Sequence, residues 1–255
     1  MKNPIKLFKE LLFPPRCAAC GKLLTPSLEG ETEALCATCS AAWVRETTHQ
    51  CPTCFLAYHT CRCSLSNMQA KGIAVYVKLA PYGDEESVVK RTVVGLKDHI
   101  SARTVQFLAR ELTPGVRAAI EASERTRRKN GEAPLETVIC HLPRQKHNRR
   151  RAGFDQAAVL ARALAAELSF PYLPLLKRVR DGVPQKDLSR RAREKNLQGA
   201  FAATGDVAGK RVLIVDDIVT TGAGMASAAA LLPAAEKMAV SVAYTEKKLQ
   251  KKQKS

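Results

Sequence analysis

The sequence predicts an α/β protein with a parallel sheet, preceded by a small cysteine-rich domain that binds metal. Two patterns support this prediction. Apolar strand-like and helix-like segments alternate over residues 70–245, and eight of the nine cysteines lie between residues 17 and 63. Continuous apolar strands that alternate with helices are typical of a parallel sheet covered on both faces. The length of 255 residues allows one large domain or two unequal ones.

The expected elements follow from the spacing of apolar residues. Strands are expected at Ile73 to Leu79, Thr137 to Leu142, Arg211 to Val215 and Ala239 to Tyr244. Helices are expected at 84–98, 101–112 and 154–168, and from about Gly222 onward. Residues 113–134 are polar and contain Pro114 and Pro134, which indicates a partly helical surface excursion. Cys140 lies in an apolar run and is interpreted as a buried strand residue.

The two ends of the chain differ from this pattern. Residues 1–16 predict a short amphipathic helix that packs on the next domain, because the segment ends at Pro14-Pro15 without a small-residue cleavage site. Residues 246–255 are rich in lysine and predict a basic, disordered tail. No apolar run reaches 18 residues, so we expect no membrane-spanning helix and a cytoplasmic location.

The eight clustered cysteines form four close pairs, which suit two tetrahedral zinc sites, because a Cys-x2-Cys turn directs both sulfurs at one ion. The predicted ligands are Cys17, Cys20, Cys36 and Cys39 in the first site, and Cys51, Cys54, Cys61 and Cys63 in the second. The first quartet has the spacing of a zinc ribbon. In the second, a single residue separates the last two cysteines, so His59 remains an alternative ligand. Disulfides are disfavoured without an export signal, and thioredoxin-type redox sites carry one such pair rather than four.

Residues 17–66 therefore predict a double zinc ribbon. The segment holds one tryptophan, Trp43, and few large aliphatic residues, so apolar burial alone is insufficient to fold it. Metal binding would supply the missing free energy, on the order of 10 kcal/mol per structural zinc. A site closed by four cysteines leaves no position for a reacting water, which indicates a structural or docking role.

The ligand-binding site is expected at the carboxyl end of the strand that begins at Arg211. Two carboxylates, Asp216 and Asp217, follow its apolar run, and a loop of small residues comes next: Thr220, Thr221, Gly222, Ala223 and Gly224. Ligands of open α/β sheets bind beyond the carboxyl ends of strands, and such a loop offers N–H groups and hydroxyls to a phosphate. The carboxylates are suited to accept hydrogen bonds from sugar hydroxyls, which together predicts a ribose 5-phosphate site. A phospho-receiver domain also opens with such acids, but it needs about 100 further residues, far more than follow Asp217.

Residues 212–224 resemble the phosphoribosyl pyrophosphate (PRPP) motif of type I phosphoribosyltransferases. The order of cysteine pairs followed by this motif resembles the ComF (competence protein F) family, from Cys17 to about Tyr244. Further matching residues are Leu142-Pro143-Arg144, Arg149-Arg150-Arg151, Gly153-Phe154-Asp155-Gln156 and parts of 185–201. The resemblance implies a type I phosphoribosyltransferase-like domain over residues 70–245.

The resemblance also implies roles for individual residues. Asp216 and Asp217 would be the catalytic pair and would hold the ribose hydroxyls, while 220–224 would hold the 5-phosphate. Pro143 and Arg144 would face the pyrophosphate, which binds with magnesium, and 180–200 would form part of a hood. Three positions depart from the family pattern: Asp155 replaces the usual Asn, Ala152 replaces Arg, and Gly224 replaces Thr. We expect these departures to affect turnover more than the binding of PRPP.

The net charge of +17 indicates a polyanionic or phosphorylated partner. More than half of the excess lies between residues 144 and 195, where six arginines are candidates for nucleic-acid contacts: Arg149, Arg150, Arg151, Arg190, Arg191 and Arg193. Aromatic residues make up only 5% of the chain, which disfavours a base-stacking platform.

Two functions stay open. One is a magnesium-dependent phosphoribosyltransferase whose acceptor the sequence does not identify. The other is a non-catalytic DNA-binding accessory protein of natural transformation, which would use the phosphate loop to grip nucleotides. The partners expected from the resemblance are PRPP or a related phosphoribosyl ligand, single-stranded DNA, and a competence helicase or other DNA-uptake proteins.

Overall fold

The computed structural model describes residues 14–24, 34–98, 101–144, 154–180 and 199–245. The helix expected within residues 1–16 falls mostly outside these ranges, and the tail expected at 246–255 falls wholly outside them. Also outside the described ranges are Ala152, most of the expected hood and the six arginines proposed to contact nucleic acid.

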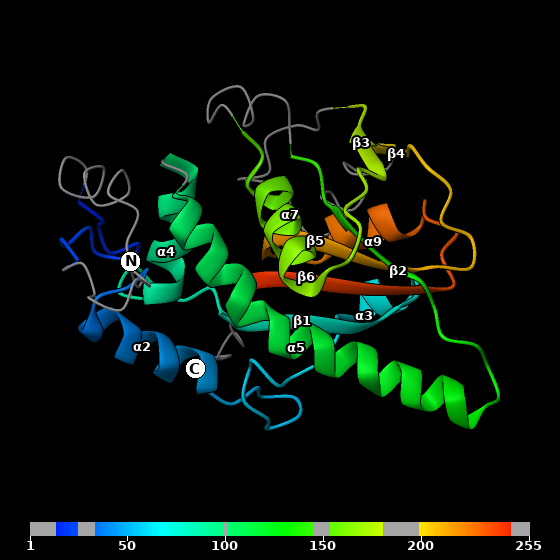
Figure 1. Cartoon of the computed structure of the whole chain (residues 1–255), viewed down its shortest axis with the longest axis horizontal. Coiled ribbons are helices and arrows are strands. Elements are labelled where there is room, and N and C mark those ends of the chain that lie inside the picture. Colours follow the sequence, from blue (N-terminus) through cyan, green and yellow to red (C-terminus); the bar gives the residue numbers. More distant parts are fainter. Residues whose placement is uncertain (1–13, 25–33, 99–100, 145–153, 181–198, 246–255) are drawn as a thin grey trace, which may run out of the picture.

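A four-stranded parallel sheet forms the centre of the protein (Figure 1). Its strands are β1 (Ile73–Pro81), β2 (Thr137–His141), β5 (Arg211–Val219) and β6 (Glu236–Tyr244), in the order β1-β6-β5-β2. Strand β5 pairs with β2 on one side and β6 on the other. It is therefore an interior strand, and its carboxyl end has a neighbouring strand on both sides. The parallel sheet predicted from the sequence is confirmed, and Cys140 is buried in β2 as expected.

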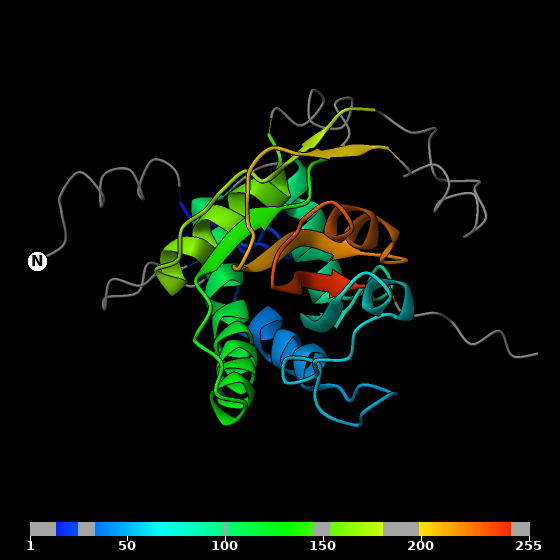
Figure 2. The same ribbon diagram turned by 90° about the vertical axis from the view of Figure 1, so that its right-hand side faces the viewer.

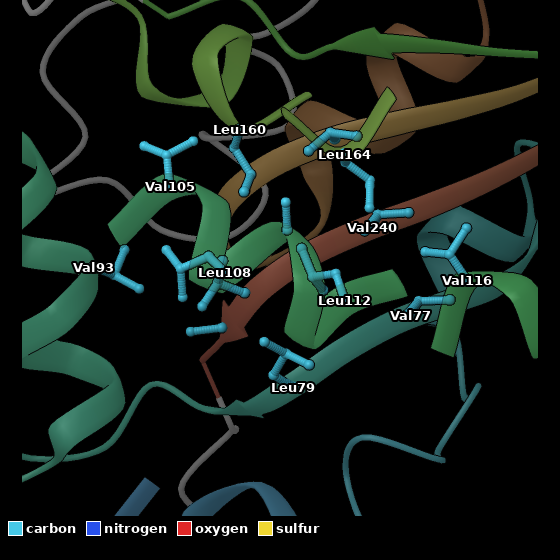
Figure 3. Close-up of a cluster of buried hydrophobic side chains, with 14 of the residues drawn as sticks. Val77, Leu79, Val93, Val105, Leu108, Leu112, Val116, Leu160, Leu164 and Val240 are labelled. Atoms are coloured by element: carbon cyan, nitrogen blue, oxygen red, sulfur yellow. The ribbon is translucent and has the colours of Figure 1, made fainter. Parts of the chain in front are cut away.

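One face of the sheet is covered by three helices: α4 (Val88–Asp98), α5 (Ala102–Lys129) and α7 (Gln156–Leu168). Figure 3 shows their side chains in contact with alternate residues of the strands. Leu108 and Leu112 of α5 and Leu160 and Leu164 of α7 lie in one buried cluster with Val240 of β6. Side chains at every second strand position point to the same face, so this cluster takes one set of residues from each strand.

The other face is covered by α9 (Ala223–Ala229) and by α3 (Ser66–Gln69), a four-residue helix that directly follows the cysteine-rich segment. The two helices lie against each other on the right of the sheet in Figure 2, opposite α5 and α7. Met68 of α3 and Met225 of α9 are buried in one cluster with Val212 and Ile214 of β5. Both faces of β5 are therefore buried, which explains its continuous apolar run.

A two-stranded antiparallel ribbon, β3 (Leu176–Arg178) with β4 (Phe201–Ala203), lies apart from the main sheet. The resemblance implies that 180–200 form part of a hood, and this ribbon joins the two ends of that segment. The two strands of three residues each were not predicted from the sequence.

The cysteine-rich segment has no core of its own among the described residues. Helix α2 (Ala37–Thr48) packs on α4 and β1. The Trp43 indole donates a hydrogen bond to Glu111 of α5 over 2.7 Å. The Glu46 carboxylate accepts from the Val88 and Val89 N–H groups over 2.8 and 3.1 Å, which satisfies free donors at the start of α4.

The second half of the segment lies at the open edge of the sheet. The N–H of Tyr76 in the edge strand β1 donates to the Arg62 carbonyl over 3.2 Å, so the segment covers backbone groups that an edge strand otherwise exposes. Cys51 and Cys61 belong to the core on the α9 side, whereas Cys17 and Cys39 belong to the core on the α5 side. The two groups of cysteines therefore pack on different parts of the molecule.

Residues 113–134 are partly helical as expected, but their helical part is a continuation of α5 through Pro114 to Lys129 and not a separate surface excursion. Val116 and Ala119 are buried, so this half of the helix still faces the core. Its end is anchored by Arg211 of β5, a fully buried side chain that donates to Ser123 over 3.0 Å and to Glu124 over 2.6 Å. The same guanidinium donates to Glu236 of β6 over 2.6 Å. An isolated polar helix end would fray, and this tertiary contact stabilises it.

We predict that Arg211→Met lowers the free energy of unfolding by about 3 kcal/mol, because it leaves two carboxylates in a partly buried site without their counter-charge. The measurement is urea unfolding of the purified protein. Arg125→Met is the matched control on α5, since its ion pair with Glu121 is exposed and should change stability by less than about 0.5 kcal/mol. Equal effects of the two changes would contradict the anchoring role.

Candidate functional site

The carboxyl ends of β2 and β5 bring together residues that the sequence analysis singled out in separate segments. The Arg144 guanidinium, three residues beyond β2, donates to the Asp217 carboxylate over 2.9 Å. It also contacts the Gln156 side chain at the start of α7. The N–H of Leu142 bonds the Val215 carbonyl of β5 over 2.9 Å, which fixes the path of the chain as it leaves β2. Arg144 and Asp217 thus form one site.

The two carboxylates lie inside β5, which extends four residues beyond the predicted strand to Val219. Asp216 accepts the Asp217 N–H over 2.8 Å, and Asp217 accepts the Ile218 N–H over 2.9 Å. Burial and the neighbouring charge of Asp217 raise the pKa of Asp216 well above its ordinary value, although Arg144 acts in the opposite direction. The pair therefore holds a proton more readily than two exposed aspartates would. It can exchange hydrogen bonds with hydroxyl groups of a ligand.

The loop after β5 turns at Gly222, which has a positive φ of 75° and is the N-cap of α9. A Cβ at this position would lie 2.8 Å from both Leu65 Cδ1 and Met68 Sδ of the α3 region. The turn therefore requires glycine for its backbone conformation and for the space beside it. Helix α9 has seven residues, so an anion at this end would be bound mainly by loop N–H groups and the Thr220 and Thr221 hydroxyls.

Asp155, one of the three departures from the family pattern, has a definite place. Its Oδ1 accepts the Ala158 N–H over 3.3 Å and is the N-cap of α7, while its Oδ2 accepts the Arg144 N–H over 3.0 Å. A carboxylate offers two acceptor oxygens, whereas an asparagine offers one. Asp155 can therefore hold both ends of the segment between β2 and α7. From the sequence, Asp155 stands out only as a departure from the family pattern.

His141, the last residue of β2, contacts the same carboxylate and was not singled out from the sequence. Its Nε2 lies 4.0 Å from Asp155 Oδ2, and its Nδ1 lies 2.9 Å from the Tyr172 hydroxyl. Burial lowers the pKa of His141 despite the nearby Asp155, and the Arg162 guanidinium, which lies over the Tyr172 ring, lowers it further. A neutral imidazole is thus favoured beside the loop that carries Arg144. No sequence pattern links these residues, because the contact arises from tertiary packing.

Gly224, the second described departure, has a packing explanation. A Cβ on this residue would lie 3.0 Å from Leu142 Cδ2. A threonine in this backbone would require the end of the Leu142 side chain to shift by a few tenths of an ångström, and Leu142 begins the segment that leads to Arg144. The glycine therefore allows the β2 and β5 loops to approach closely.

The two groups of cysteines fit metal ions. Within each quartet all Sγ atoms lie within 4.8 Å of one another, and none of the eight cysteines forms a disulfide. Burial raises the pKa of Cys17 and Cys51, but hydrogen bonds from backbone N–H groups outweigh it and hold each pKa at about 7, whereas burial raises the pKa of Cys39 and Cys63. Thiolates are the form that binds metal, so both groups are suited to do so. His59 is not part of the second group, and its Nδ1 lies 3.0 Å from the Thr47 carbonyl.

None of the helices in the described ranges is long and apolar enough to cross a membrane.

The chain was compared with known proteins. Residues 155–254 match the family "Phosphoribosyl transferase domain". DNA utilization protein YhgH of Salmonella typhi is 31% identical over 225 residues, which cover 87% of this chain and 92% of that protein. The YhgH of Salmonella typhimurium is 32% identical over 226 residues, with the same coverage. Competence protein F of Haemophilus influenzae is 30% identical over 112 residues, which cover 42% of this chain and 49% of that protein.

The domain match agrees with the parallel sheet and with the site at the end of β5, and the Salmonella proteins align along nearly their whole length. The chain therefore belongs to the ComF family of phosphoribosyltransferase-like proteins.

Proposed function

We propose that the protein binds PRPP, or a related ribose 5-phosphate ligand, at the carboxyl end of β5. The observation that carries this proposal is the convergence of Arg144 on Asp217 beside the loop at 220–224. A cation, a pair of hydroxyl acceptors and a phosphate loop at one sheet edge match the three chemical parts of such a ligand. The match to the phosphoribosyl transferase domain family supports the same ligand class.

Each residue has a defined task in this proposal. Asp216 and Asp217 accept hydrogen bonds from the ribose hydroxyls, and the N–H groups and hydroxyls of 220–224 bind the 5-phosphate. Arg144 binds the pyrophosphate, because a planar guanidinium donates two parallel hydrogen bonds to phosphate oxygens. Carboxylate oxygens are suited to Mg²⁺, which would neutralise charge on the pyrophosphate.

In the transferase form of the proposal, the bond between the ribose C1 and pyrophosphate breaks and a bond to an acceptor forms. Positive charge develops at C1, and the leaving pyrophosphate gains negative charge that Arg144 stabilises. Release of pyrophosphate that depends on an added acceptor is the signature of turnover. Binding without release would favour the non-catalytic form.

We further propose that both cysteine groups hold structural zinc, in a cytoplasmic protein whose thiols stay reduced. Purified protein is expected to contain two zinc ions per chain by elemental analysis. Cys36→Ser and Cys54→Ser should each remove one ion, because each breaks one of the two quartets.

Cys140→Ser is the control for zinc content and should retain both ions, since Cys140 is buried in β2. Retention of both zinc ions in Cys54→Ser, or a wild-type protein with only one ion, would contradict the second site. A folded protein without zinc would contradict both.

For PRPP, the double change Asp216→Asn with Asp217→Asn is expected to weaken binding about 100-fold, since two hydrogen bonds to charged acceptors contribute about 1.5 kcal/mol each. Calorimetric titration measures the affinity. Asp206→Asn is the control, because Asp206 precedes β5 at its amino end. Zinc content should be unchanged in both variants. Equal affinity of the double variant and the wild type would show that β5 does not carry the PRPP site.

A second candidate function is DNA binding without catalysis, in cooperation with a competence helicase or other DNA-uptake proteins. It is favoured by the names of the relatives, DNA utilization protein and Competence protein F, and by the net charge of +17. The candidate contacts are the six arginines named above, which lie outside the described residues.

This candidate predicts single-stranded DNA binding of micromolar strength or weaker, with log K falling by about 3 per tenfold rise in salt, as expected for four or five ionic contacts. Changing Arg190, Arg191 and Arg193 to Ala should flatten that slope by about 2. Titrations over a range of salt concentrations measure both slopes. Displacement of DNA by PRPP would indicate that the two ligands share a site. A DNA affinity that does not depend on salt would contradict the DNA proposal.

A further inference from the structure

The loop proposed to bind phosphate rests directly on α3. Asn67 donates from Nδ2 to the Thr221 carbonyl over 3.0 Å, a contact that spans 154 residues of sequence. Leu65 and Met68 fill the space beside Gly222 so closely that a Cβ there would lie 2.8 Å from each of them. Figure 2 shows α3 beside α9, the helix that this loop begins. Three residues of the α3 region thus fix the position of Thr221 and Gly222.

Helix α3 cannot hold this position by itself. It has four residues, which is too short for a stable isolated helix, and no side chain caps its N-terminus. It begins three residues after Cys63, the last member of the second cysteine group. Ser64, between them, donates to the Ile73 carbonyl of β1 over 2.7 Å. The place of α3 therefore depends on its packing on α9 and β1 and on the segment from Cys61 to Cys63 that leads into it.

Lys78 of β1 also contacts the segment from Cys61 to Cys63. Its side chain is buried, and its Nζ donates to the Cys63 carbonyl over 3.0 Å and lies 3.2 Å from Cys61 Sγ. The rings of Tyr76 and Tyr244 lie 4.8 and 5.4 Å from the same ammonium group. A buried cation needs a nearby negative charge. Four thiolates around a divalent ion carry two net negative charges, so the surroundings of the second group fit a metal-bound state.

We propose that Asn67 is a positioning residue, and that the metal of the second cysteine group holds α3 so that Asn67, Leu65 and Met68 keep the phosphate loop in its binding conformation. The first cysteine group has no such role, because Cys17 and Cys39 pack with α4 and α5 on the other face of the sheet. The inference rests on the proposed function for its ligand. The coupling between α3 and the loop is a property of the protein without ligand.

The first test compares two substitutions in α3. Asn67→Ala removes the hydrogen bond to Thr221, and amide hydrogen exchange of residues 219–224 should become about tenfold faster without ligand. PRPP affinity should fall about tenfold as well. Gln69→Ala is the matched control, since Gln69 is exposed on the same helix. Both variants should keep two zinc ions and the melting temperature of the wild type, which separates positioning from a general loss of structure.

The second test compares the two metal sites. Cys54→Ser should release one zinc, speed exchange at 219–224 and weaken PRPP binding. Cys20→Ser should release the other zinc and leave exchange at 219–224 unchanged. If Cys54→Ser does not fold, the Asn67→Ala comparison decides, because it keeps all eight cysteines. Unchanged loop exchange in Asn67→Ala, or equal effects of the two cysteine changes, would overturn the inference.

The proposed function and this inference fail in different ways. Wild-type protein that does not bind PRPP contradicts the proposed function, while loop exchange still tests the coupling. Wild-type protein that binds PRPP, together with an Asn67→Ala variant of equal affinity and equal loop exchange, contradicts the inference alone.

Discussion

The hydrogen bond from Arg144 to Asp217 joins two segments that are 73 residues apart, and it exists because β2 and β5 are neighbouring parallel strands. Neighbouring parallel strands have their carboxyl ends at the same edge of the sheet, so the loops that follow them lie close together. Because β5 lies between β2 and β6, both neighbouring strands support the site. Arg144 approaches from β2, and Asp216 pairs with Ser241 of β6. The cysteine-rich segment is connected to this arrangement through the edge strand β1 and α3.

The sequence predicted the parts of the site that are local. Asp216, Asp217 and the loop to Gly224 form one continuous stretch, and the cysteine quartets are defined by spacing alone. Contacts between distant segments were not predictable in this way. Pro114 suggested the end of a helix, but Arg211 anchors α5 beyond it through Ser123 and Glu124. Strands β3 and β4 have three residues each, too few for a periodic pattern. Asn67 has no signal in the sequence, since its role depends on packing against Thr221.

Two departures from the family pattern are explained by packing. Asp155 replaces an asparagine, and its two carboxylate oxygens accept the Arg144 and Ala158 N–H groups. Gly224 lacks the hydroxyl of a threonine but lets Leu142 approach the start of α9. Asp155 connects the segment after β2 with the start of α7, whereas Gly224 leaves space for Leu142 beside the start of α9. Both departures therefore affect the backbone on either side of Arg144, whose guanidinium contacts Gln156 and Asp217.

The cysteine-rich segment also differs from an independent docking module. Its buried residues join the two cores of the sheet, with the first group near α5 and the second near α9. A metal ion in such a group stabilises more than its own turn, because the side chains next to it pack on the strands that carry the site. The buried ammonium of Lys78 shows this most directly, since it lies between Cys61 and the aromatic rings of β1 and β6. Loss of negative charge from the second group would leave that cation uncompensated within the sheet's own core. The second cysteine group and the sheet are therefore parts of one folding unit on this face of the protein.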